Sequence, residues 1–361
     1  MRSPSWSTIV LLRRMMIAGA VATFVLGAVR PGAAAEPDAE VWLVSTRGAS
    51  RSRVSAEAGE RIRYFVLGQS RRWRPSSAEA LIEAIQTPVP TTIFVHGNRA
   101  DWGDATSEAF ELLRAIGRQA PERAFRMVIW SWPSDRIRGG NRKDVRVKAA
   151  YSDVQGHYLA DFLRRLDPKV PVNLVGYSFG ARIITVALDL LDGGRRGSTT
   201  LPEPGPRDPA AAEPAPLPAE PHLPAELPAA AAPPKRRAVL IAAALDAGWL
   251  APGGRHGRAA GQVERMLITR NCCDPVLRLY PLMNGLGGPQ ALGYVGPVCL
   301  GDNRAKTETV DVSCAVGRAH DWSRYIAAPG LKRRLAEFSF LDSAAGEPAP
   351  ALPEAPVGVP Q

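Results

Sequence analysis

The chain lacks several features that would define a protein class at once. Across its 361 residues no internal repeat stands out, and no continuous apolar run reaches the ~20 residues that span a bilayer comfortably. Lysine is scarce, the many arginines are scattered rather than grouped, and no known nucleic-acid-binding module is present. The formal net charge of +10 therefore does not indicate nucleic-acid binding. The length suffices for one large domain or for two.

The first 35 residues have the pattern of an export signal. Arg2, Arg13 and Arg14 precede the uncharged run Met15–Val29, and small residues follow up to Ala35. We expect cleavage near that alanine and a periplasmic or secreted protein. The paired arginines also fit a twin-arginine signal. If the segment stayed uncleaved, it would attach the protein to a membrane through its N-terminus.

Cysteine is also rare, with four residues that all lie in the last third of the chain. None is in the paired Cys-x-x-Cys form that favours zinc. In an exported chain, two disulfides are the better prediction. A bond between the adjacent Cys272 and Cys273 would be strained, so we expect each to pair with Cys299 or Cys314, in an order that the sequence leaves open.

Short apolar runs alternate with longer helical patterns along the chain, which is typical of an α/β fold. We predict a mainly parallel sheet of about eight strands with helices on both faces. The expected strands are 41–46, 62–67, 92–95, 126–130, 172–175, 239–244, 264–269 and 309–312. The expected helices are 78–86, 107–117, 143–166 and 181–190.

Two segments have a composition that cannot build a packed core. About a third of the residues between Leu201 and Pro234 are proline, and alanine and glutamate make up most of the rest. We therefore divide one α/β domain into two parts, 36–200 and 237–340, around a disordered insert at 201–236. The insert lacks the large apolar residues of a lid over a lipid site. The tail, 341–361, has a similar composition and is expected to be disordered as well.

The pentapeptide Gly176-Tyr177-Ser178-Phe179-Gly180 is the most informative motif in the chain. It follows an apolar strand-like run and opens a helix-like one. In that context Gly-x-Ser-x-Gly forms a strained turn that lifts the serine hydroxyl above the sheet, and the two glycines let strand and helix approach. The motif predicts Ser178 as a nucleophile.

A serine nucleophile needs a base, an acid that orients the base, and amides that hold the oxyanion. Upstream, the predicted strand 92–95 runs into His96 and Gly97, so we assign Gly97 and Asn98 to the oxyanion hole, with the amide of Phe179 as its second donor. The neighbouring glycine suggests that His96 braces this loop and does not shuttle protons.

Downstream residues supply the acid and the base. Asp274 follows the predicted strand 264–269 and precedes a proline, so it is either the orienting acid, a helix N-cap, or both. Asp246, after the preceding strand, is the alternative acid. His320 follows the last predicted strand, whereas His222 lies in the insert and His256 in a Gly/Arg-rich loop without an evident rigid scaffold.

The cysteines lie close in sequence to the acid and the base. Cys272 and Cys273 adjoin Asp274, and Cys314 lies shortly before His320. A disulfide between this pair and Cys314 would tie the two loops together and hold the Asp–His hydrogen bond.

With these residues in place, the chain resembles the serine-hydrolase members of the α/β-hydrolase fold, and more narrowly a lipase- or esterase-like bacterial family of unknown function. The likeness covers about residues 90 to 328 apart from the insert. It rests on the segments 94–97, 130–134 and 175–180, on Asn271 with Asp274, and on Ala319-His320. Asn98-Arg99 departs from the Tyr-Asn often found after His-Gly, and Tyr177 stands where histidine is common.

The resemblance implies Ser178 as nucleophile, Asp274 as acid and His320 as base. We therefore expect an exported enzyme that cleaves carboxylic esters through an acyl-enzyme, without metal or cofactor, on a small-molecule or lipid substrate. A catalytically silent binding protein of the cell envelope, or an acyltransferase with the same triad, is the alternative. The sequence selects neither the ester nor an oligomeric state.

Overall fold

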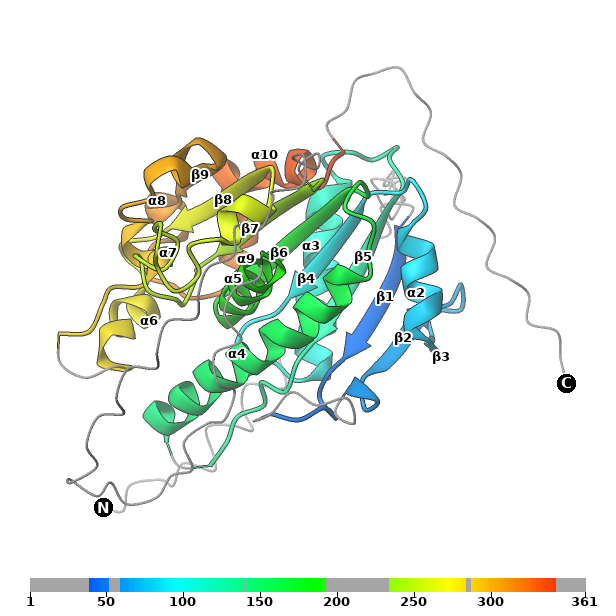
Figure 1. Cartoon of the computed structure of the whole chain (residues 1–361), viewed down its shortest axis with the longest axis horizontal. Helices are drawn as coiled ribbons and strands as arrows, with labels where there is room; N and C mark the ends of the chain where they lie inside the picture. The colour runs from blue at the N-terminus through cyan, green and yellow to red at the C-terminus, as the bar shows by residue number, and fades with distance from the viewer. Residues whose placement is uncertain (1–38, 52–58, 139, 193–233, 284–286, 342–361) are drawn as a thin grey trace, which may run out of the picture. The chain divides into compact units, whose positions relative to one another are not determined.

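The computed structural model describes residues 39–51, 59–138, 140–192, 234–283 and 287–341. The predicted signal segment (1–35) lies outside these residues. So do the insert (201–236) apart from its last three positions, and the tail (341–361) apart from Leu341. The part that is described is built on one nine-stranded sheet (Figure 1), against the eight strands expected.

The sheet is parallel except at one edge. Its order is β3-β2-β1-β5-β4-β6-β7-β8-β9, and only the pairs β1–β2 and β2–β3 are antiparallel. The strands are β1 (Ala39–Ser45), β2 (Arg63–Leu67), β3 (Trp73–Ser76), β4 (Thr91–Val95), β5 (Phe125–Ser131), β6 (Val172–Tyr177), β7 (Arg236–Ile241), β8 (Arg265–Arg270) and β9 (Thr307–Asp311). Because β6 pairs with β7, the chain before and after the predicted insert contributes to the same sheet.

Helices cover both faces of the sheet, as expected (Figure 1). The helix pair α4 and α5 packs together on one face, and α3, α9 and α10 contact one another on the other. The helices are α2 (Ala78–Ile85), α3 (Trp102–Gly117), α4 (Asn141–Arg164), α5 (Phe179–Leu191), α6 (Pro275–Arg278), α7 (Leu292–Val295), α8 (Ser313–Val316), α9 (Trp322–Ala327) and α10 (Pro329–Phe338). Short 3-10 helices are η1 (Ala259–Gln262), η2 (Tyr280–Met283) and η3 (Gly301–Lys306).

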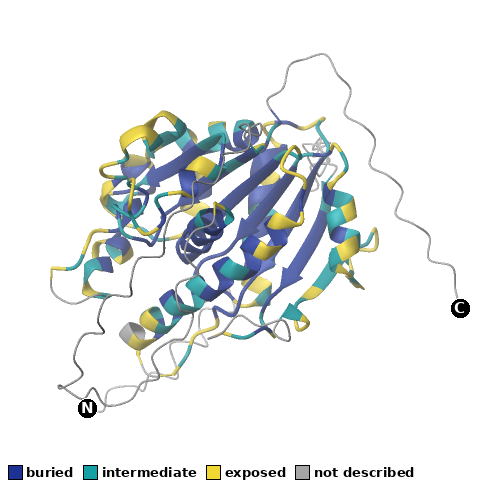
Figure 2. Cartoon of the chain, in the orientation of Figure 1, coloured by how far each residue is buried: buried dark blue, intermediate teal, exposed yellow. Residues whose placement is uncertain are grey.

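The core lies where these layers meet the central strands. Every residue of β4, β5 and β6 is buried, which matches their continuous apolar runs and the two helical layers over them (Figure 2). Most predicted elements are confirmed with shifted ends. The strand β3 was not predicted, because it is a short edge strand that contains a proline. The predicted helix 107–117 begins earlier, at Trp102, because Asp101 and Asp104 form a capping box there.

No helix in the described ranges combines the length and the apolar character that crossing a membrane requires.

Candidate functional site

The turn between β6 and α5 holds Ser178 in a conformation that side chains rarely adopt. Its backbone angles are φ 54° and ψ −114°, which store about 1–3 kcal/mol of strain. The surrounding chain compensates, since the Ser178 amide donates to the Ile241 carbonyl at 2.9 Å and the Ser178 carbonyl accepts from the Ala244 amide at 3.3 Å. The nucleophile position is thus held by β7 and the loop after it.

The two glycines of the motif are required by close approach of the backbone. A side chain at Gly180 would collide with the carbonyl of Val95 in β4. A Cβ at Gly176 would lie 2.6 Å from the amide nitrogen of Ala181 in α5. These contacts explain why small residues stand two positions on either side of Ser178.

His320 and Asp274 lie next to the serine in a continuous chain of hydrogen bonds. His320 Nε2 lies 3.2 Å from Ser178 Oγ, and His320 Nδ1 lies 2.7 Å from Asp274 Oδ2. The three side chains come from the segments that follow the carboxyl ends of β6, β8 and β9, with α8 between β9 and His320. The structure therefore brings together the three residues that the sequence predicted as nucleophile, acid and base.

Asp274 uses its two oxygens for different purposes. Oδ1 accepts from the amides of Val276 and Leu277 at 2.9 and 3.0 Å and so caps α6. Oδ2 accepts from His320 and from the hydroxyl of Tyr325, which is 2.7 Å away. The predicted N-cap is thus confirmed, and the contact with His320 is the one that the predicted orienting acid would make.

The charge state of Asp274 follows from these contacts. Complete burial alone would raise its pKa, but the hydrogen bond and the charge of His320, the Leu277 amide and the Tyr325 hydroxyl outweigh burial, so the pKa is lowered. The ionised carboxylate can only accept. The shared proton therefore sits on His320 Nδ1, which leaves Nε2 free to accept a proton from Ser178.

The acid loop and the base loop are joined by hydrogen bonds and not by a disulfide. The Cys272 amide donates to Ser313 Oγ, and Asn271 Nδ2 donates to the Gly317 carbonyl, both at 3.0 Å. All four cysteines lie in the described part of the chain, and each is a free, exposed thiol. The expected pairings of Cys272 and Cys273 with Cys299 and Cys314 are therefore not formed in this structure and stay a prediction.

The loop after β4 lies against Ser178. A Cβ at Gly97 would be 3.4 Å from Ser178 Cβ, so the predicted oxyanion residues are beside the serine. Within the described residues, the amides of Asn98 and Phe179 donate to no protein group. Phe179 also begins α5, whose N-terminus favours negative charge. These two amides are available to hold an oxyanion.

His96 braces this loop, as expected. Its Nε2 accepts from the Trp132 amide at 3.2 Å, and its Nδ1 donates to the Gly97 carbonyl at 2.9 Å. The Trp132 indole nitrogen donates to the His96 carbonyl at 2.9 Å. Burial lowers the pKa of His96 to about 3, so the ring is neutral at physiological pH and acts structurally.

Asp144 fixes the same loop from α4, which the sequence did not reveal. Its side chain is 1% exposed, and Oδ2 accepts from Asn98 Nδ2 at 3.2 Å and from Arg99 Nε at 2.9 Å. Oδ1 accepts from the Ile137 amide at 3.0 Å. Arg99 itself has a positive φ of 64°. One buried carboxylate thus holds the strained turn next to Ser178, through contacts between distant segments that no local motif indicates.

Asp246, the alternative acid, accepts from the Tyr280 hydroxyl at 2.6 Å, whereas Asp274 is the acid that contacts His320. The expectation that His256 lacks a rigid scaffold is wrong. His256 is 3% exposed, and its Nδ1 lies 2.9 Å from Thr185 Oγ1 because its loop packs against α5. Burial holds its pKa well below the usual value, so it is a neutral packing residue.

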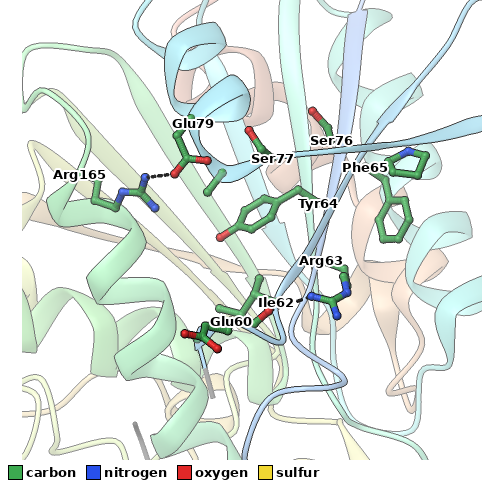
Figure 3. A pocket seen from close by; sticks show the side chains of 12 residues that line it. Glu60, Ile62, Arg63, Tyr64, Phe65, Ser76, Ser77, Glu79 and Arg165 are labelled. Carbon is green, nitrogen blue, oxygen red and sulfur yellow. Dashed lines mark hydrogen bonds and ion pairs between the residues drawn. The ribbon is translucent and has the colours of Figure 1, made fainter. Parts of the chain in front are cut away.

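A separate hollow lies along the antiparallel edge of the sheet (Figure 3). Tyr64 of β2 stands in it, and Arg165 reaches Glu79 at 3.0 Å across it. Arg63 donates to the Glu60 carbonyl at 2.8 Å. None of Ser178, Asp274 and His320 lines this hollow, and of its charged groups Arg165 pairs with Glu79. The hollow is therefore separate from the cluster of Ser178, His320 and Asp274.

Comparison with models of known protein families finds no match, and neither does comparison with curated protein sequences.

Proposed function

We propose that this protein is a serine hydrolase of the α/β-hydrolase fold that cleaves carboxylic esters through an acyl-enzyme. The mostly parallel sheet and the strained serine between β6 and α5 support this fold. The observation that carries the proposal is the chain of hydrogen bonds from Ser178 Oγ through His320 to the buried Asp274. That arrangement is the one in which a hydroxyl becomes a nucleophile.

In the proposed reaction, Ser178 Oγ attacks the ester carbonyl carbon while His320 Nε2 takes the hydroxyl proton. Asp274 stabilises the imidazolium that forms. As the tetrahedral intermediate collapses, His320 gives its proton to the departing alcohol and the acyl group stays on Ser178. Water then attacks the acyl-enzyme with His320 as base, and the acid is released. The steps use only protein groups and water.

Two backbone amides and a helix N-terminus stabilise the negative charge on the tetrahedral oxygen in this scheme. The amides of Asn98 and Phe179 donate to that oxygen, and the N-terminus of α5 adds its dipole. Loss of one such donor costs about 10²–10³-fold in turnover in serine hydrolases. The positions of His96 and Asp144 around the loop keep this geometry fixed before substrate arrives.

The test is fluorophosphonate labelling together with hydrolysis of short nitrophenyl esters by the full chain. We expect a single labelled residue, Ser178, and a loss of several orders of magnitude in kcat for Ser178→Ala and His320→Ala. Ser323→Ala is the matched control, because this serine is exposed on α9 near the site and its hydroxyl contacts only Glu111. The control should keep full activity.

The alternatives predict different outcomes. A folded protein that is not labelled, and whose residual hydrolysis is unchanged in Ser178→Ala, would be a binding protein. Preferred formation of a new ester when an alcohol is added would identify an acyltransferase. Export is tested by locating the mature protein in cell fractions and sequencing its N-terminus, which we expect to begin near residue 36.

A further inference from the structure

The exposed large apolar side chains of the described residues gather in one segment. All five lie between residues 276 and 298, and Val276 and Leu279 are 53% and 56% exposed. Isolated exposed apolar residues are normal, whereas a group of them marks an interaction surface. We call this group the apolar rim: Val276 in α6, Leu279 directly after it, Leu282 in η2, Val295 in α7, and Val298.

The elements that carry the rim are adjacent. The helix α6 contacts both η2 and α7, and Val276, Leu279 and Leu282 recur at every third position. Val276, Leu279, Leu282 and Val295 therefore lie on or next to neighbouring elements, and Val298 follows α7 by three residues.

The charge of this segment is unusual for an exposed surface. From residue 275 to residue 300 the sequence contains no acidic residue and one basic residue, the exposed Arg278. A second cation comes from α4, where exposed Arg146 donates to the carbonyl of Met283 in η2. Exposed apolar side chains bordered by arginines match the interface of a bilayer, where acyl chains lie beneath anionic headgroups.

The rim adjoins the reaction site. The helix α6 begins directly after Asp274, whose Oδ1 caps it while Oδ2 contacts His320. The strands β6, β7 and β8 are parallel neighbours, so the turn from β6 to α5 and the loop from β8 to α6 lie at the same edge of the sheet (Figure 1). A surface bound to the rim would therefore lie beside the nucleophile.

We propose that the apolar rim docks on an anionic phospholipid surface, with Val276 and Leu279 in the acyl region and Arg278 and Arg146 at the headgroups. Binding itself is independent of catalysis. The further consequence, that the docked surface presents its esters to Ser178, rests on the proposed function.

The test uses the full chain with Ser178→Ala, so that lipid hydrolysis does not contribute. Leu279→Trp places a probe in the rim, and vesicles of phosphatidylcholine and phosphatidylglycerol with brominated acyl chains quench an indole that enters them. The matched control is Lys169→Trp, at an exposed position before β6 and so at the opposite edge of the sheet. We expect extra quenching for Leu279→Trp only. Quenching at one tryptophan position is measured because every variant also contains the apolar N-terminal run, which could bind vesicles by itself.

A second measurement uses Val276→Ser with Leu279→Ser. Loss of two partly inserted apolar side chains should weaken vesicle binding about tenfold. Arg278→Gln should weaken it a fewfold, and only on anionic vesicles. Equal quenching at both probe positions, or unchanged binding of the double variant, would refute docking. Concentration-dependent self-association that the double variant loses would identify a second copy of the chain as the occupant and also refute it.

Because these variants lack the nucleophile, a negative binding result leaves ester cleavage untouched. An inactive parent enzyme that still docks would overturn the proposed function and not the docking surface.

Discussion

Replacement of Asp144 by asparagine tests whether a buried carboxylate sets the catalytic geometry from a distance. The asparagine side chain has nearly the same size but only one oxygen. If that oxygen keeps the Ile137 amide, the new NH₂ group faces Asn98 Nδ2 and Arg99 Nε, which are both donors. Two charge-assisted hydrogen bonds are then lost.

The expected change in the free energy of unfolding follows from the burial of Asp144. Hydrogen bonds to charged groups contribute about 1.5–3 kcal/mol each, and the Asp144 side chain is 1% exposed whereas that of Arg99 is 38% exposed. Part of the loss is recovered as the arginine moves toward solvent, so we expect a decrease of roughly 2–4 kcal/mol in the free energy of unfolding. The loop that carries the Asn98 amide should shift, and kcat/KM for a nitrophenyl ester should fall about 10–10²-fold, since complete loss of an oxyanion donor costs more.

The assay compares kcat/KM and thermal unfolding for Asp144→Asn and Asp153→Asn. Asp153 is the matched control because it lies on the same helix and also accepts from two cations, Arg182 and Arg255. Both variants should unfold at lower temperature, but only Asp144→Asn should lose turnover. A stable, folded Asp144→Asn enzyme with kcat/KM within about twofold of the parent would refute the reasoning.

Three further predictions concern the same edge of the sheet. Gly180→Ala should lower stability by several kcal/mol, because its Cβ collides with the Val95 carbonyl, and circular dichroism melting should show it, whereas Gly261→Ala, with open space around it, should not. Tyr325→Phe removes a hydrogen bond that Asp274 accepts, so the pKa of Asp274 should rise. We expect kcat to fall a fewfold and the acidic limb of the pH–rate profile to shift to higher pH. Burial and neighbouring carboxylates raise the pKa of Glu108 to about 8, so the folded state binds more protons than the unfolded chain between pH ~4.5 and ~8 and stability falls across that window. Glu108→Gln should remove this slope in melting temperature, whereas Glu111→Gln should only reduce it, because Glu111 is one of the carboxylates that raise the pKa of Glu108.

The sequence predicted the parts of the site that local chemistry determines. The glycines around Ser178 reflect contacts with the next strand and helix, and the aspartate–proline pair at 274–275 reflects a helix start. The sequence analysis missed residues whose contacts join segments that are far apart in sequence. Asp144 lies in the polar first turn of a helix, where an acidic residue is common, and only tertiary packing places it under Asn98 and Arg99.

Contacts between distant segments also explain why the sequence analysis was wrong about His256 and missed β3. The loop that carries His256 is rich in glycine and arginine, which is typical of an exposed loop, but its histidine is buried against α5. The short strand β3 has too few apolar residues to be visible as a period-two pattern. In each case the deciding partner is far away in sequence.

The backbone of Ser178 depends on residues made much later in synthesis. Its amide and carbonyl are held by Ile241 and Ala244, beyond the proline-rich segment. A nascent chain that ends before β7 therefore contains the whole Gly-x-Ser-x-Gly motif but not the partners that stabilise its strained serine. If Ser178 is the proposed nucleophile and the chain is exported unfolded, its hydroxyl would reach the reactive position only after β7 has formed outside the cell.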